Sequence, residues 1–188
     1  MMKIKVTQTS IEGLLVIEPH VVHDGRGYFF ESFNNKEFRE ATGMKVSFVQ
    51  DNQSFSCRGV LRGLHFQLPP HSQAKLVSVV AGKVLDVAVD LRKGSTTYGK
   101  YQAVELSEDN HLQVFIPRGF AHGYVVLSET ALFQYKCDSL YAPGYEGGLA
   151  WDDPDIGIKW PVAQQDILLS DKDRNRGLLK DFDSPFKY

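Results

Sequence analysis

Short runs of β-branched and aromatic residues recur along the chain, and residues that favour turns separate them. The runs are GLLVIEP, GYFFESF, VSFVQD, GVLRGLHFQ, KLVSVV, KVLDVAVDL, YQAVEL, LQVFIP, AHGYVVL and ALFQYKC. Gly, Pro, Asn, Asp and Ser border them, which is typical of strands joined by short connections. The run KVLDVAVDL alternates between two faces, one with Leu85, Val87, Val89 and Leu91 and the other with Val84, Asp86, Ala88 and Asp90. This pattern predicts an all-β protein.

Helical periodicity is scarce by comparison. The stretch NKEFREATG places Phe38 and Ala41 on one side and ends at Gly43, which predicts a short helix. Ser170 is a suitable N-cap for a second short helix near the C-terminus. Many short strands and few helices predict an antiparallel sandwich or barrel of the jelly-roll kind. Since the chain has 188 residues and neither a linker nor a repeat, we expect a single domain over residues 1–188, with 171–188 as a tail.

Composition narrows the functional classes. The formal net charge is −2, whereas nucleic-acid-binding proteins typically carry an excess of Lys and Arg. No apolar run approaches the ~20 residues that cross a bilayer, and the N-terminal MMKIKVTQTS lacks the apolar stretch of a signal peptide. Cys57 and Cys137 lie outside any CxxC motif, which favours reduced thiols. We therefore expect a cytoplasmic protein without a membrane or nucleic-acid partner.

The run GVLRGLHFQ carries the first candidate chemistry. In a regular strand Arg62 and His65 would point to opposite faces, but Gly63 between them is typical of a bulge that could turn both side chains into one cavity. Metal-binding jelly rolls commonly have two histidines one residue apart, whereas this chain has Gln67 in place of the second. We therefore expect no metal, and proton transfer becomes the obvious use of an inward histidine.

Further polar residues are scattered over the other runs and the tail. They are Arg26, Glu31, Gln50, Asp51, Asn52, Lys75, His122, Tyr135, Tyr141, Glu146, Lys172 and Asp173. Each alone is more typical of a solvated or half-packed side chain than of a site. Together they could supply a phenolic acid, cations for an oxyanion or a diphosphate, and an aromatic ring to stack on a base.

The chain resembles the dTDP-4-dehydrorhamnose 3,5-epimerases, which are metal-free cupins of deoxysugar biosynthesis. The motifs that carry the resemblance run in family order over nearly the whole chain: RGYFFESFN, FVQDNQS, GVLRGLHFQ, GKVLDVAVDLRKGS, IPRGFAHGY, QYKCDSLYAP, EGGLAWDDPDIGI and LSDKD. The resemblance implies a cupin-type jelly-roll barrel with a few short helices. It also implies a homodimer that exchanges N-terminal strands, the substrate dTDP-4-keto-6-deoxy-D-glucose, and no cofactor.

The resemblance also implies a role for each motif residue. His65 of GLHFQ corresponds to the base, Asp173 of LSDKD to its hydrogen-bond partner, Tyr135 of QYK to the acid on the opposite sugar face, and Lys75 to the group near the keto oxygen. Tyr141 occupies the position of a tyrosine that stacks on thymine. The remaining nucleotide-sugar positions are Arg26, Glu31, Gln50, Asp51, Asn52, Arg62, His122, Glu146 and Lys172.

Three other functions remain open at this point. A relative that inverts only C3 or only C5 can keep the same histidine and tyrosine. A sugar-nucleotide 3,4-ketoisomerase on a related cupin also deprotonates C3, but the QYK and LSDKD motifs argue against it. A non-enzymatic cupin that binds a sugar nucleotide would not need His65 and Asp173 together.

Overall fold

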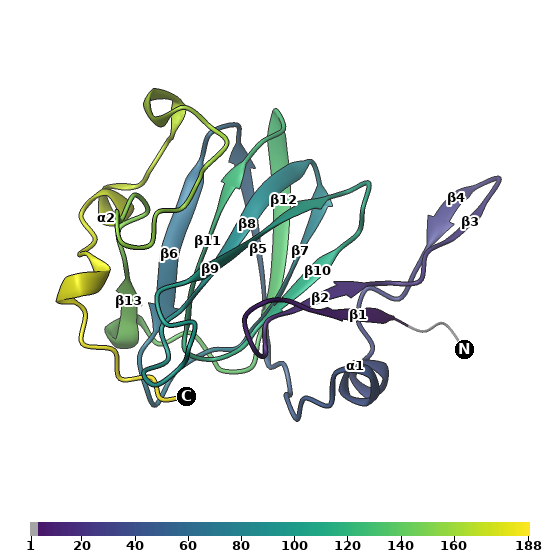
Figure 1. Ribbon diagram of the computed structural model, residues 1–188. Helices are drawn as coiled ribbons and strands as arrows, with labels where there is room; N and C mark the ends of the chain where they lie inside the picture. The colour runs from purple at the N-terminus through teal and green to yellow at the C-terminus, as the bar shows by residue number, and fades with distance from the viewer. Residues whose placement is uncertain (1–3) are drawn as a thin grey trace.

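A computed structural model describes residues 4–188 and consists mainly of two antiparallel sheets that face each other (Figure 1). The six-stranded sheet has the order β1 (Lys5–Gln8), β2 (Leu15–Glu18), β10 (Gln113–Ile116), β7 (Lys75–Ala81), β12 (Thr130–Cys137), β5 (Gln50–Cys57). The five-stranded sheet has the order β13 (Glu146–Gly148), β6 (Leu61–Gln67), β11 (Phe120–Val126), β8 (Lys83–Asp90), β9 (Tyr101–Ser107). The predicted jelly-roll barrel is thereby confirmed. One domain over 1–188 stays a prediction, and residues 1–3 lie outside the described residues.

Apolar side chains from both sheets meet in the interior. One cluster packs Val77, Val114 and Phe133 of the six-stranded sheet against Val84 and Tyr124 of the other. A second cluster lies on the outer face of the five-stranded sheet, where the C-terminal segment covers it with residues that include Leu149, Leu179 and Phe186. Strand β8 contributes to both clusters, so its alternating faces are both buried, as sheets covered on two sides require.

The two predicted helices are present with their predicted caps. Helix α1 (Asn35–Thr42) ends at Gly43, whose φ of 71° is the left-handed C-cap conformation that glycine adopts without strain. Helix α2 (Asp171–Arg174) begins after Ser170, whose side chain accepts the backbone N–H of Asp173. The remaining helical turns are η1 (Pro143–Tyr145), η2 (Gln164–Asp166) and η3 (Leu179–Asp181).

Two strand predictions were wrong in their bounds. The expected strand over 46–51 instead begins at Gln50 and continues to Cys57, as β5. Its residues QDNQSFSC are mostly polar because part of this strand lines a cavity, so hydrophobic alternation could not find it. The run over 27–33 is a strand only as far as Phe29.

A two-stranded hairpin stands apart from both sheets. Strands β3 (Val22–Asp24) and β4 (Gly27–Phe29) pair only with each other and project away from the barrel in Figure 1. Tyr28 is 55% exposed and Phe29 is 63% exposed. The hairpin thus presents two neighbouring aromatic side chains to solvent.

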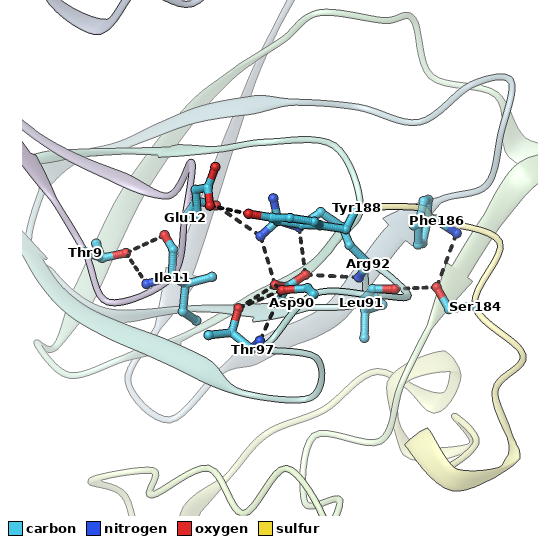
Figure 2. Close-up of polar contacts among 11 residues, drawn as sticks. Thr9, Ile11, Glu12, Asp90, Leu91, Arg92, Thr97, Ser184, Phe186 and Tyr188 are labelled. Atoms are coloured by element: carbon cyan, nitrogen blue, oxygen red, sulfur yellow. Dashed lines mark hydrogen bonds and ion pairs between the residues drawn. The ribbon is translucent and has the colours of Figure 1, made fainter.

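A buried carboxylate at the end of β8 binds side chains of the loop that follows, next to the chain's C-terminus (Figure 2). Asp90 is fully buried and accepts hydrogen bonds from Arg92 at 2.8 Å, from Ser95 at 2.6 Å and from Thr97 at 2.7 Å. The Arg92 guanidinium lies 5.0 Å from the ring of Tyr188, whose hydroxyl bonds to Glu12. Burial alone would raise the pKa of Asp90, but these bonds outweigh it and lower that pKa.

Substitution Asp90→Asn is expected to lower the free energy of unfolding by about 3–5 kcal/mol, because it leaves Arg92 beside a group that cannot balance its charge. The contribution is present above the unfolded pKa of the carboxyl and disappears as the pH falls through the lower folded one. Urea unfolding at neutral pH measures the loss. Asp183→Asn is the control: Asp183 pairs with Lys93 at the surface, where the expected effect is about 0–1 kcal/mol. Equal effects for both variants would contradict the prediction.

Candidate functional site

The irregularity predicted at Gly63 is present. His65 pairs with His122 on β11 and Arg62 pairs with Tyr124, so three steps along β6 match two steps along β11. This extra residue is a bulge, and it turns Arg62 and His65 toward one cavity of about 330 Å³ that both side chains line. The conclusion drawn from the glycine in GVLRGLHFQ is therefore confirmed.

A second cavity of about 390 Å³ adjoins the first, since His65 lines both. Strands β5, β6, β7 and β12 and the segment that contains Tyr141 supply its walls. The predicted site residues along it are Gln50, Asn52, His65, Lys75, Tyr135, Tyr141 and Glu146. His65 and Glu146 line both cavities, while Arg62, Lys172 and Asp173 line the smaller one. Together the two cavities could hold an elongated polar ligand.

His65 and Asp173 form a close pair although 108 positions separate them. Nε2 of His65 lies 2.5 Å from Oδ1 of Asp173. The histidine side chain is one-third exposed, at 33%, whereas the Asp173 side chain is 5% exposed. Burial alone would raise the pKa of Asp173, but hydrogen bonds from His65, Ser170 and the backbone of Gly63 lower it. The ionised carboxylate therefore orients the imidazole through Nε2, and Nδ1 is the ring nitrogen that Asp173 does not bind.

Lys75 and Tyr135 lie on the neighbouring strands β7 and β12. The Lys75 ammonium is 5.8 Å from the centre of the Tyr135 ring. Burial lowers the pKa of Lys75, although Asp86 and Glu146 act in the opposite direction. Burial also raises the pKa of Tyr135, so its phenol stays protonated at neutral pH. The cavity thus combines an imidazole, a cation and a phenolic acid.

Glu146 links the rim of the larger cavity to the C-terminal segment. Its carboxylate accepts from Tyr141 Oη at 2.9 Å, from Arg176 at 2.8 Å and from Lys172 at 2.6 Å. Burial alone would raise its pKa, but these three donors lower it. Tyr141 remains 53% exposed, so its ring is available to stack on a planar ring of a ligand.

Four of the predicted residues do not line either cavity. Arg26 pairs with Asp24 at the tip of the outlying hairpin, and Glu31 follows the same hairpin and faces Asn34. Asp51 lies on the opposite face of β5 from Gln50 and Asn52, where it binds Lys136 at 2.9 Å. His122 is buried in the barrel and lies 2.7 Å from Asp86. Burial lowers the pKa of His122 in spite of that carboxylate.

Sequence reasoning missed several residues of this region. Gln67 and Gln73 also line the larger cavity, and Arg176 holds Glu146. Asp86 had a usable signal, because the alternation of KVLDVAVDL puts a carboxylate on the same face as Val84 and Ala88. The two glutamines had no signal, since amide side chains in a loop or at a strand end are common.

Neither a metal cluster nor a membrane-spanning helix is found in the part of the chain that the structure describes. Across residues 4–188, no three His, Cys, Asp or Glu side chains gather in a way that could hold a metal ion. Within the same range, none of the helices is long and apolar enough to cross a membrane. Cys57 and Cys137 are both free thiols.

Comparisons with known proteins point to one family. The family model described as dTDP-4-dehydrorhamnose 3,5-epimerase matches residues 8–181. A curated relative of that name from Methanothermobacter thermautotrophicus is 53% identical over 176 residues, which cover 93% of this chain and 94% of the relative. Among solved structures, a dTDP-6-deoxy-D-glucose-3,5-epimerase from Legionella pneumophila in complex with dTDP-4-keto-L-rhamnose is 46% identical, with a TM-score of 0.94 and 98% of each chain covered. A 3'-monoepimerase from Streptomyces bikiniensis in complex with dTDP-quinovose is 38% identical, with a TM-score of 0.85 over 92% of this chain and 86% of that one.

Proposed function

The chain belongs to the dTDP-4-dehydrorhamnose 3,5-epimerase family, and on that premise we propose that it converts dTDP-4-keto-6-deoxy-D-glucose into dTDP-4-keto-L-rhamnose by inverting carbons 3 and 5. The observation that carries the proposal is the His65–Asp173 pair beside a cavity that Lys75 and Tyr135 also line. The relative that is structurally similar over 98% of both chains was solved with dTDP-4-keto-L-rhamnose, which is the product of the double inversion.

Proton abstraction is assigned to His65. A ketone at C4 acidifies the C–H bonds at C3 and C5, so a neutral imidazole can remove either proton once the enolate is stabilised. Asp173 accepts the Nε2–H of His65, and Nδ1 is then the nitrogen that takes the proton. The same carboxylate stabilises the imidazolium after the transfer. The electrons move into the substrate's own carbonyl, so the proposed reaction uses no cofactor.

Lys75 is assigned to the keto oxygen. Negative charge develops on O4 as the proton leaves, and a half-buried ammonium beside the cavity stabilises that charge more strongly than water does. Tyr135 is assigned the return of a proton from the opposite face, because His65 reaches only one face of the ring. Its raised pKa keeps the hydroxyl protonated and able to donate at neutral pH.

The remaining cavity residues are assigned to the nucleotide and the sugar. Tyr141 offers an exposed ring for the base, while Arg62 and Lys172 offer cations for the diphosphate from the adjoining cavity. Gln50 and Asn52 are assigned amide contacts to ligand hydroxyls, and Glu146 is assigned a carboxylate contact. Asp51 binds Lys136 on the opposite face of β5, and His122 is buried against Asp86, so the arrangement of these two residues does not support a direct contact with the ligand.

We propose a homodimer because two predicted binding residues, Arg26 and Glu31, line neither cavity of their own chain. In one chain Arg26 and Glu31 belong to or follow the outlying hairpin, whose aromatic residues are exposed. We assign them to the site of a second copy, reached by exchange of the N-terminal strands. Sedimentation of the active protein as a monomer would contradict this assembly. Cytoplasmic location likewise stays a proposal, and the free thiols of Cys57 and Cys137 support it.

Lys75→Met is expected to lower kcat by about 10²–10³-fold, because one aimed donor to a developing oxyanion is lost. The wild-type kcat is expected to fall on the alkaline side below the usual lysine pKa of 10.5, since burial lowers the pKa of Lys75 and its charge is lost as the pH rises through that value. Lys75→Arg keeps the cation and is expected to move this limb to higher pH. An alkaline limb unchanged in Lys75→Arg would contradict the assignment.

Proton NMR in deuterated water tests the proposed function directly. The purified chain is incubated with dTDP-4-keto-6-deoxyglucose in the absence of any reductase, and the C3 and C5 proton signals are followed. Loss of both signals is the expected result. Exchange at one carbon only would indicate a single-site epimerase, and saturable binding without exchange would indicate a sugar-nucleotide binder without this activity.

A further inference from the structure

The segment 138–142 carries Tyr141, which lines the larger cavity, and forms neither a helix nor a strand. It connects the end of β12, which bears Tyr135, to the turn η1. Irregular backbone of this kind needs hydrogen-bond partners from elsewhere in the molecule when it is partly buried. The partners of this segment are largely glutamine side chains, and they come from three separate parts of the chain.

Four consecutive residues of the segment each bond to a glutamine. Gln73 Nε2 donates to the carbonyl of Ser139 at 2.8 Å, and Gln67 Nε2 donates to the carbonyl of Leu140 at 3.3 Å. The N–H of Tyr141 donates to Gln50 Oε1 at 2.8 Å. The N–H of Ala142 donates to Gln67 Oε1 at 2.7 Å. These side chains therefore hold the backbone on both sides of Tyr141.

Gln67 is the central member of this set. It is 5% exposed and ends β6, the strand that carries His65. Besides its two bonds to the segment, its Nε2 donates to the carbonyl of His71 at 2.7 Å, which ties in the loop that precedes Lys75. The Gln67 amide thus connects β6, which carries His65, with the loop that precedes Lys75 and with the segment that contains Tyr141.

We propose that Gln67 and Gln73 are positioning residues that hold Tyr141 in place for the nucleotide base. The inference rests on the proposed function, since it gives Tyr141 a base to stack on. Neither glutamine needs to contact the ligand. Each orders the backbone of segment 138–142 in the free protein, so the entropy cost of ordering that segment is not added when the nucleotide binds. Loss of either glutamine therefore weakens nucleotide binding more than it slows the chemical step.

A double-mutant cycle with dTDP as the probe tests this coupling. Gln67→Met keeps the length of the side chain and removes all three bonds, whereas Gln73→Met removes one. By loss of preorganisation we expect the Kd for dTDP to rise about tenfold in the first variant and about threefold in the second. In a Tyr141→Ala background, the same substitutions are expected to change the Kd by less than about twofold, because the ring that they position is gone.

Equal weakening in the Tyr141 and Tyr141→Ala backgrounds would overturn the inference, because it would mean that the glutamines contact the ligand directly or stabilise the cavity as a whole. A KM that stays constant while kcat falls would overturn it as well. Gln73→Met keeps the test decisive if Gln67→Met fails to fold. Gln102→Met is the matched control, since its amide donates to the carbonyl of Ala103 on β9.

The outcome is separable from that of the proposed function. Exchange of the C3 and C5 protons by the wild-type chain tests the reaction without reference to the glutamines. If Tyr141→Ala alone leaves the Kd for dTDP unchanged, the base contact and this inference both fail while the assignment of the reaction stands.

Discussion

Replacement of His65 by asparagine is expected to abolish epimerisation while dTDP binding persists. His65 is the imidazole of the larger cavity, and Asp173 fixes its orientation through a 2.5 Å contact. Asparagine can still bond to Asp173 but cannot take a proton from carbon at neutral pH. We expect kcat to fall by about 10³-fold or more, toward the upper end of what positioned proton transfer contributes.

The measurement is solvent exchange followed by proton NMR, with dTDP titration in parallel. Loss of exchange at both C3 and C5 with an unchanged dTDP affinity is the expected pair of results. His20→Asn is the matched control, because His20 is exposed and lines neither cavity. Epimerisation at the wild-type rate in His65→Asn would remove His65 as the base.

Replacement of Tyr135 by phenylalanine is expected to separate proton removal from inversion. The variant keeps the ring beside Lys75 and the contact with Phe133, whose ring centre is 6.1 Å away, but it lacks the hydroxyl. His65 can still remove a proton and return deuterium to the same face. The substrate should therefore exchange with solvent while inverted product falls by about 10²–10³-fold, the order that a lost general acid costs.

Two rates measured in one sample decide this prediction. The rate of deuterium incorporation and the rate of inverted product formation are compared for wild type and Tyr135→Phe. Tyr101→Phe is the control, because the Tyr101 hydroxyl only accepts the backbone N–H of Lys159 outside the cavity. Unchanged inversion in Tyr135→Phe would mean that another group or a water molecule delivers the proton.

Local patterns were sufficient for most of the architecture. Turn residues between short β-rich runs predicted the jelly roll, and the alternation in KVLDVAVDL predicted which side chains share each face of that strand. The structure shows that both faces are buried. Gly63 predicted the bulge that brings Arg62 and His65 to one cavity. The polar strand β5 was missed for most of its length, because residues that line a polar cavity do not alternate in hydrophobicity as core strands do.

The sequence by itself determined which residue types are available and on which face of a strand each lies, because side-chain alternation is a local property of extended backbone. Motif resemblance extended this to the roles proposed for His65, Tyr135 and Lys75. The resemblance also implied that Asp173 bonds to His65, and the structure shows this contact across 108 positions. Only the tertiary structure decided that glutamines hold the backbone around Tyr141. It also decided that Arg26 and Glu31 lie away from the cavity of their own chain. Such contacts depend on how distant strands and loops pack, and no local pattern of residues encodes that packing.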